Sequence, residues 1–243
     1  MRVVTLKIND REMSGRDDEN ILQVARENGI DIPTLCQVDG LSEWGGCRLC
    51  LVEIEGSNKL SPACVTRVSE GMRVTTTSDR LQGYRRSIVE MLFTEGNHIC
   101  SVCVSNNNCE LQDMSHELKI DHISLPYFFP SKKVDASHDK FVYDANRCIL
   151  CTRCVRACDE VEGAHTWDVA GRGLKSHLVS DLQQPWGDSD TCTSCGKCVQ
   201  VCPTGALYEK GMAAGEMVKK TEFIAYITEM RKDSAENPEG DDR

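Results

Sequence analysis

The amino-terminal part of the chain alternates apolar and polar residues in the way that short strands do. Residues 3–8 predict one strand, the Asn9-Asp10 pair predicts a turn, and a short second strand should follow. Residues 51–54 and 141–144 predict two further strands. The chain is therefore expected to begin with a β-hairpin.

Apolar residues recur at helical spacing in three places. Residues 21–25 predict a helix that stops at Gly29, and a second helix should run from a cap at Ser78 or Asp79 to Gly96. The second helix is expected to turn one apolar face into a core, made of Leu81, Tyr84, Ile88 and Leu92. A third helical face, docking on this chain or on a partner, is predicted for Phe223, Ile224, Ile227 and Met230. From Arg231 onward the charged composition predicts disorder.

The cysteine spacing changes this picture, because one pattern occurs twice. Residues 148–158 and residues 192–203 both contain C-x2-C-x2-C-x3-C, and the second copy closes with Pro203. We call these copies the first and second motif. Their spacing is that of a bacterial ferredoxin with two [4Fe-4S] clusters.

In such a motif the fourth cysteine faces away from the first three. Three cysteines two residues apart can wrap one cluster, while the fourth lies a helical turn further on and ligates the other cluster. The two predicted [4Fe-4S] sites are therefore Cys148, Cys151, Cys154 and Cys202, and Cys192, Cys195, Cys198 and Cys158. Structural zinc is the alternative, but zinc binds two cysteine pairs and has no use for a third closely spaced cysteine.

Four earlier cysteines, Cys36, Cys47, Cys50 and Cys64, are spaced C-x10-C-x2-C-x13-C, and the glycine pair Gly45-Gly46 precedes the second of them. Paired glycines allow backbone amides to approach a cluster closely. A hairpin, a helix, a cysteine-rich loop and a strand resemble the [2Fe-2S] domain of plant-type ferredoxins, in the longer-loop form found at the N-terminus of the complex I 75 kDa subunit. The resemblance implies one [2Fe-2S] cluster on these four cysteines, with zinc as the alternative.

Cys100, Cys103 and Cys109 are one ligand short of a four-ligand site, and His98 is the near neighbour able to supply it. Fifteen cysteines and one histidine then make four complete ligand sets. The stretch resembles the histidine-ligated [4Fe-4S] site of the complex I 75 kDa subunit and of iron-only hydrogenases. In those relatives the histidine usually sits four residues before the first cysteine, where this chain has Gly96. The alternative is a histidine without a metal role, as expected for His116, His122, His138, His165 and His177.

Composition and charge indicate the number of domains, the cellular compartment and the classes of partner that suit this chain. A chain of 243 residues with 40% hydrophobic residues suits two or three small domains better than one large core. The N-terminus has no apolar signal segment and no apolar run is long enough for a membrane span, so the cysteines are expected in the reducing cytoplasm. The net charge of −10 argues against nucleic-acid binding.

Taken in order, the modules resemble the γ (diaphorase-moiety) subunits of cytoplasmic NAD-reducing [NiFe]-hydrogenases, which are related to the N-terminal part of the complex I 75 kDa subunit. The resemblance covers nearly the whole chain and is carried by residues 46–50, 96–103, 109–113, 148–158 and 192–203. It implies an α+β fold: a β-grasp [2Fe-2S] ferredoxin domain at 1–78, a small helical [4Fe-4S] domain of one histidine and three cysteines with a connector at 79–140, a bacterial 2[4Fe-4S] ferredoxin-like domain at 141–220, and a helix with an acidic tail at 221–243.

The resemblance also implies an oxidoreductase subunit that relays electrons through one [2Fe-2S] and three [4Fe-4S] clusters. Its expected partners are a flavin- and NAD-binding diaphorase subunit and the hydrogenase small and large subunits, which would hold FMN, NAD and nickel-iron. The sequence has no G-x-G-x-x-G and no Walker loop, so no catalytic residue is expected on this chain. Two alternatives are the iron-sulfur subunit of an NAD-dependent formate dehydrogenase or other complex I-like dehydrogenase, and a zinc-binding adaptor without a redox role.

Overall fold

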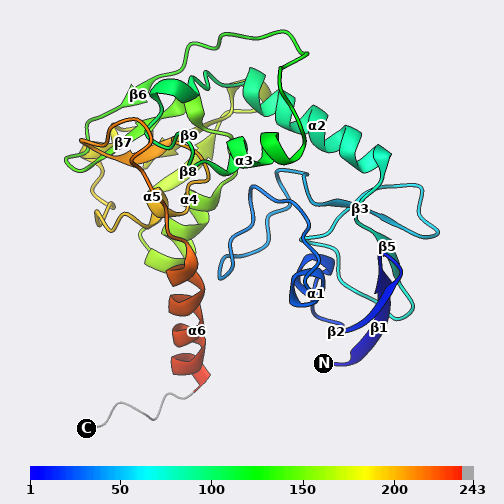
Figure 1. Cartoon of the computed structure of the whole chain (residues 1–243). Helices are drawn as coiled ribbons and strands as arrows, with labels where there is room; N and C mark the ends of the chain where they lie inside the picture. Colours follow the sequence, from blue (N-terminus) through cyan, green and yellow to red (C-terminus); the bar gives the residue numbers. More distant parts are fainter. Residues whose placement is uncertain (237–243) are drawn as a thin grey trace. The chain divides into compact units, whose positions relative to one another are not determined.

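The computed structural model describes residues 1–236, which form two compact units (Figure 1). Unit 1 contains residues 1–37, 43–92 and 113–126. Unit 2 contains residues 38–42, 93–112 and the described residues from 127 onward. The segment 79–140, expected as one small domain with a connector, is thus shared between the two units.

Unit 1 is built on a mixed five-stranded sheet in the order β2-β1-β5-β3-β4. Its strands are β1 (Val3–Ile8), β2 (Arg11–Arg16), β3 (Leu51–Ile54), β4 (Ser61–Pro62) and β5 (Arg73–Thr75). β1 and β5 run parallel, and the other neighbours run antiparallel. The predicted amino-terminal hairpin is confirmed, and Asn9 and Asp10 both take the positive φ that a tight hairpin turn requires.

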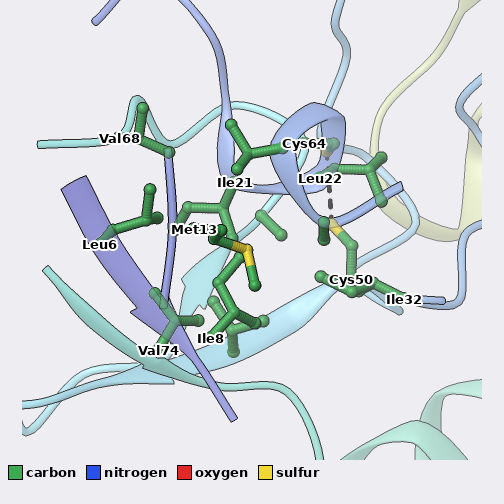
Figure 2. Packing of buried hydrophobic residues seen from close by; sticks show 14 of the residues in the cluster. Leu6, Ile8, Met13, Ile21, Leu22, Ile32, Cys50, Cys64, Val68 and Val74 are labelled. Carbon is green, nitrogen blue, oxygen red and sulfur yellow. Dashed lines mark hydrogen bonds between the residues drawn. The ribbon is translucent and has the colours of Figure 1, made fainter. Parts of the chain in front are cut away.

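A short helix, α1 (Ile21–Glu27), packs its apolar side chains against this sheet. It starts with a capping box, in which the Asn20 side chain accepts the Gln23 backbone N–H and the Gln23 side chain accepts that of Asn20. Figure 2 shows Ile21 of α1 with strand side chains around Met13, and Leu22 of α1 on the side of Cys64. The core reaches Cys50 and Cys64, so hydrophobic burial fixes the loops that carry these cysteines.

The second predicted helix is α2 (Asp79–Thr94), and its buried face agrees only in part with the one expected, since Leu81 is fully buried as predicted. Ser78 caps it, because its Oγ accepts the Leu81 backbone N–H at 3.2 Å. The expected core residue Tyr84 is 48% exposed, whereas Arg85 and Val89 are 2% and 0% exposed. The prediction was wrong for Tyr84, because it considered only apolar side chains, while the inward face of α2 continues from Leu81 to an arginine that binds backbone carbonyls.

Unit 2 holds small sheets and short helices around its cysteines. An antiparallel sheet in the order β10-β7-β6 consists of β6 (Val134–Asp135), β7 (Phe141–Asp144) and β10 (Leu207–Glu209). A separate hairpin consists of β8 (Trp167–Ala170) and β9 (His177–Ser180). The helices are α4 (Arg153–Arg156), a π-helix at Ala157–Glu162 and α5 (Lys197–Gln200), with 3-10 turns at Cys100–Val102, Ala145–Arg147, Gly173–Lys175 and Trp186–Asp188. The helix α3 (Glu110–Glu117) starts in unit 2 and continues into unit 1.

The last helix, α6 (Glu222–Glu236), docks on unit 2 (Figure 1). Ile224 is fully buried against a cluster that includes Val38, Val161 and Val201. A Cβ on Gly40 would lie 2.7 Å from the Ala225 Cα, so only glycine permits this close approach. The expected disorder from Arg231 is wrong up to Glu236, since α6 continues there; residues 237–243 lie outside the described part. Within residues 1–236, no helix has the length and apolar character to cross a bilayer.

Candidate iron-sulfur sites

Four cysteines of unit 1 gather at the edge of its hydrophobic core. The Sγ atoms of Cys50 and Cys64 lie 3.3 Å apart, and this contact is the dashed line in Figure 2. Thiol hydrogen bonds connect Cys36 to Cys47 and to Cys64. The structure therefore brings together the four cysteines named as the candidate [2Fe-2S] ligands.

The contacts among these thiols move their pKa values in opposite directions. Hydrogen bonds from Cys47 and Cys64 lower the pKa of Cys36, and one from Cys64 lowers the pKa of Cys50. The bonds to Cys36 raise the pKa of both Cys47 and Cys64. The thiolate is the form of cysteine that binds a metal. Cys36 and Cys50 are therefore disposed to ionise before a metal binds, whereas Cys47 and Cys64 would lose their protons only when it binds.

Arg85 of α2 holds the loop around Cys50 from inside unit 1. Its guanidinium donates to the backbone carbonyls of Leu49 and Leu51 at 3.1 Å each, and to that of Thr76 at 2.9 Å. Burial lowers the pKa of this arginine. Because Leu49 and Leu51 flank Cys50, the arginine fixes the backbone on both sides of a candidate ligand.

The glycine pair before Cys47 lets its loop turn tightly. Gly45 has a φ of +67°, and a Cβ on Gly46 would overlap the indole of Trp44. The Leu35 backbone N–H donates to the Cys47 Sγ at 3.4 Å. The close approach of glycine amides to a cluster stays a prediction.

In unit 2, His98 and three cysteines line one small cavity of about 10 Å³, which we call the His98 site: His98, Cys100, Cys103 and Cys109. The ring of His98 contacts Phe93 edge-on, with centroids 5.4 Å apart. Its backbone N–H donates to the Tyr127 hydroxyl at 3.3 Å, and that hydroxyl donates to the Gly96 carbonyl at 2.6 Å. The imidazole is thus held toward the cysteines by residues outside the cysteine motif.

Gly96 is required where it stands. A Cβ at this position would lie 2.6 Å from His98 Nε2 and 2.6 Å from the Asn146 carbonyl oxygen. Such distances are too short for any side chain, so position 96 must remain glycine for the His98 ring to keep its place.

The two repeated motifs supply two further cavities. One of about 20 Å³, the first-motif site, is lined by Cys148, Cys151, Cys154 and Cys202. The other, of about 10 Å³ and called the second-motif site, is lined by Cys192, Cys195, Cys198 and Cys158. The fourth cysteine of each motif thus lies with the first three cysteines of the other motif.

Both motifs reach this arrangement with the same backbone. Leu150 and Thr152 flank the second cysteine of the first motif with φ of 53° and 59°. Ser194 and Gly196 flank the second cysteine of the second motif with φ of 58° and 74°. Left-handed residues on each side of a cysteine reverse the chain direction, so the three closely spaced thiols converge before α4 or α5 begins.

The donor chemistry of these sites fits iron-sulfur clusters. Each of the three cavities in unit 2 is walled by four thiols, or by three thiols and an imidazole, which are the donors that hold such clusters. Burial raises the pKa of Cys148, Cys154 and Cys109, and that of Cys151 to about 12. In residues 1–236 no three histidine, cysteine or acidic side chains are spaced for a single metal ion.

Four family models match successive parts of the chain. A 2Fe-2S iron-sulfur cluster binding domain matches residues 1–79, and the iron-sulfur binding region of NADH-ubiquinone oxidoreductase-G matches residues 85–124. The ferredoxin-like domain of NADH-quinone oxidoreductase subunit 3 matches residues 140–208. A 4Fe-4S dicluster domain matches residues 184–235. These matches confirm the α+β fold of ferredoxin-like modules and the presence of both types of iron-sulfur domain.

One relative matches from end to end. The chain is 30% identical to the NAD-reducing hydrogenase HoxS subunit gamma of Cupriavidus necator, over 99% of each chain. The chain belongs to this γ-subunit family. A chain in a crystal structure of an NAD+-reducing [NiFe]-hydrogenase in the H2-reduced state is similar to it, with a TM-score of 0.82 and 32% identity over 86% of this chain and 88% of that one.

This γ-family chain also resembles parts of larger proteins. It is 34% identical to the NADP-reducing hydrogenase subunit HndD of Solidesulfovibrio fructosivorans, over 86% of its own length and 36% of that relative. It is 32% identical to the mitochondrial NADH-ubiquinone oxidoreductase 78 kDa subunit of Candida albicans, over 91% of its own length and 31% of that relative. The chain spans about a third of these two proteins.

The three sites in unit 2 of this γ-family chain adjoin one another. Thr204 lines both the His98 site and the first-motif site, and a Cβ on the next residue, Gly205, would overlap the Cys103 Sγ. Cys154 lines the first-motif site, and Cys158, one helical turn later, lines the second-motif site. In the same way Cys198 lines the second-motif site, and Cys202, one turn later, lines the first-motif site. The first-motif site therefore lies between the other two sites, which cysteine spacing alone did not reveal.

Several side chains that contact the cysteine sulfurs were missed in the sequence. Trp186 Nε1 donates to Cys192 Sγ at 3.3 Å, while Tyr143 and Trp167 hydrogen-bond Cys148 and Cys198. His138, expected to be surface or structural, is 6% exposed and touches Cys192. Aromatic residues before and between the motifs were the only available signal, and no spacing rule connects them to a particular cysteine.

Lys219, in the segment before α6, places a positive charge beside the first-motif site. Its ammonium donates to the carbonyl oxygens of Thr204, at 2.5 Å, and Leu207, at 3.0 Å. Although burial raises the pKa of Cys202, the Lys219 charge and hydrogen bonds from Thr204 and Leu207 bring it below its usual value. A positive charge is thus held beside a candidate ligand.

Proposed function

We propose that this chain is the electron-transfer subunit of an NAD-reducing hydrogenase. It would relay electrons between a [NiFe]-hydrogenase module and an FMN- and NAD-binding diaphorase subunit. The observation that carries the proposal is the grouping of sixteen donors. Fifteen cysteines and His98 fall into four sets, each set together in space.

The proposed ligands are assigned set by set. Cys36, Cys47, Cys50 and Cys64 would hold a [2Fe-2S] cluster, for which the matched 2Fe-2S domain over residues 1–79 is the support. The His98 site, the first-motif site and the second-motif site would each hold a [4Fe-4S] cluster. The exchange of fourth cysteines between the two motif cavities supports the crossed assignment of Cys158 and Cys202.

A ligand role for His98 is supported by what surrounds its ring. The imidazole shares its cavity with three thiols, and Gly96 leaves the space that the ring needs. Neutral imidazole is a common substitute for a cysteine ligand in metal centres. We therefore assign His98 as the fourth ligand although it lies two residues, not four, before Cys100.

In this proposal the protein holds and separates redox centres and performs no substrate chemistry. A bound iron-sulfur cluster supplies one-electron transfer. The chain's own residues position the thiolates, exclude water from mostly buried cavities and place donors and Lys219 beside the sulfurs. Thr204 and Gly205 keep the His98 site against the first-motif site, which favours transfer between them.

The proposed partners are the diaphorase subunit at one end of the path and the hydrogenase small and large subunits at the other. Fifteen thiols without a disulfide among the described residues suit a reducing compartment, and we propose the cytoplasm. The formate dehydrogenase alternative has less support, because the relative that matches end to end is a hydrogenase subunit.

Anaerobic purification of the complex, with metal analysis of this chain, tests the proposal. We expect about fourteen irons per chain, the content of one [2Fe-2S] and three [4Fe-4S] clusters. A nickel-iron hydrogenase and a flavoprotein should copurify. Zinc in place of iron would contradict the proposal, and copurification with a formate-oxidising subunit would replace the proposed partners.

A further inference from the structure

His138 reaches the second-motif site from the connector between the His98 site and the first motif. Its ring stacks on Phe141, with centroids 4.9 Å apart, and tilts against Trp186 at 4.8 Å. Its Nε2 lies 3.1 Å from the Ser194 Oγ and 3.9 Å from the Cys192 Sγ. A buried imidazole therefore points one ring nitrogen at the loop of a candidate ligand.

The other ring nitrogen defines where the proton is. Nδ1 accepts the backbone N–H groups of Lys140, at 3.1 Å, and Phe141, at 3.3 Å. A ring nitrogen that accepts hydrogen bonds carries no hydrogen, so the neutral imidazole has its proton on Nε2. His138 thus directs an N–H toward Ser194 and Cys192.

Trp186 directs a second N–H at the same thiol. Its indole nitrogen is only a donor, and it lies 3.3 Å from Cys192 Sγ. The Trp186 backbone N–H donates to Asp135 Oδ2 at 2.7 Å, and the next N–H, of Gly187, donates to Ser137 Oγ at 2.8 Å. Residues 135–138 therefore hold the tryptophan loop and supply the histidine.

The first motif has no such pair at the equivalent position among the contacts described for residues 1–236. Cys148, the first cysteine of that motif, is hydrogen-bonded by the hydroxyl of Tyr143. Cys192, the first cysteine of the second motif, has the indole and the imidazole. The two motifs share one backbone geometry, so these donors are a main difference between their sites.

We propose that His138 and Trp186 form a pair of positioning N–H donors that raises the reduction potential of the cluster at the second-motif site. Hydrogen bonds to ligand sulfur stabilise the additional negative charge of the reduced state, and charge-assisted bonds are stronger than neutral ones. The inference rests on the proposed function, since it requires a cluster on Cys192. The donor pair would make the cluster at the second-motif site a better electron acceptor than the same four cysteines would without these two N–H groups.

Potentiometric titration of the full chain, followed by electron paramagnetic resonance, tests the pair. The variants are His138→Phe and Trp186→Phe, which keep an aromatic ring but remove the N–H, and His138→Gln, which keeps an N–H donor. The control is His122→Phe, because His122 is exposed and pairs with its neighbour Asp121. The signal of the second-motif cluster is identified as the one lost in Cys195→Ala.

We expect each Phe variant to lower the potential of that one signal by about 59 mV, which is a tenfold fall in the one-electron equilibrium constant. His138→Gln should recover part of the shift, and His122→Phe should cause none. An unchanged potential in His138→Phe and Trp186→Phe would overturn the proposal. A Gln variant as low as the Phe variant would also overturn it, because restoring an N–H donor at position 138 would then have no effect on the potential.

A second measurement does not depend on the variants folding. Proton ENDOR of the reduced wild-type chain should show two exchangeable couplings from N–H groups near this cluster, both lost in D2O. Their absence would overturn the donor pair. Failure of the proposed function is distinguishable, because a wild-type chain without a cluster on Cys192 would lose no signal in Cys195→Ala.

Discussion

The Sγ of Cys103 occupies the space that a Cβ on Gly205 would need. Gly205 directly follows Thr204, which lines both the His98 site and the first-motif site. The contact therefore brings Cys103, a candidate ligand of the His98 site, against the chain segment that lines the first-motif site. The close approach of the two sites depends on the absence of one methyl group.

Replacing Gly205 with alanine should disrupt the His98 site. The added Cβ would force Cys103 away from its cavity, because interiors are too well packed to absorb an overlap of this size. We expect loss of the paramagnetic signal of that site and of about four irons per chain. Gly83→Ala is the matched control: nothing lies within 4 Å of a Cβ there, and alanine should stabilise α2 by roughly 0.5–1 kcal/mol. A Gly205→Ala chain with full iron content would contradict the close approach.

Arg85→Met should loosen the loop that carries Cys50. The substitution leaves three backbone carbonyls without their buried donor, and each unsatisfied group costs about 1–3 kcal/mol. Thermal unfolding and the visible circular dichroism of the [2Fe-2S] site measure the effect. Arg80→Met, which removes an exposed ion pair with Glu53, should cost about 0–1 kcal/mol. Equal behaviour of the two variants would show that Arg85 does not support the site.

His98→Cys should lower the reduction potential of the cluster at the His98 site. Replacing neutral imidazole with a thiolate adds negative charge, and the reverse change accompanies the higher potentials of Rieske centres. Redox titration of the full chain measures the shift. The proposed ligand role fails if the potential of this cluster is the same in the variant and the wild type.

Cys158→Ala and Cys195→Ala should perturb the same paramagnetic signal, although the two cysteines belong to different motifs. The reason is that both line the second-motif site. Cys202→Ala should instead perturb the signal that Cys151→Ala removes, since those two share the first-motif site. Spectra in which Cys158 groups with Cys151 would refute the crossed arrangement.

Local patterns in the sequence were enough to predict much of unit 1. The alternation at residues 3–8 and the Asn9-Asp10 turn correspond to the observed hairpin, and the strand at residues 51–54 has the predicted bounds. The inward face of α2 was not predictable in the same way. Arg85 is buried because it binds the carbonyls of Leu49 and Leu51, which are distant in the chain, and apolar periodicity does not report such partners.

The candidate ligands could be named from spacing, because cysteine motifs encode which sulfurs can reach one cluster. The residues around them could not. His138 lies in a connector in which no motif was found, and it contacts Cys192, 54 residues further along the chain. Gly205 likewise looks like any glycine that follows shortly after a proline until Cys103 is placed beside it. Contacts of this kind arise from tertiary packing, which has no short-range pattern.

The coupled reaction of the complex tests the central claim, that this chain conducts electrons between substrate sites on other subunits. The variant is Cys151→Ala, because the first-motif site lies between the other two sites of unit 2. We predict that hydrogen-dependent NAD reduction collapses, while hydrogen oxidation and NADH oxidation with artificial dyes each continue at the wild-type rate. Wild-type rates of hydrogen-dependent NAD reduction in a variant shown to lack that cluster would contradict the account.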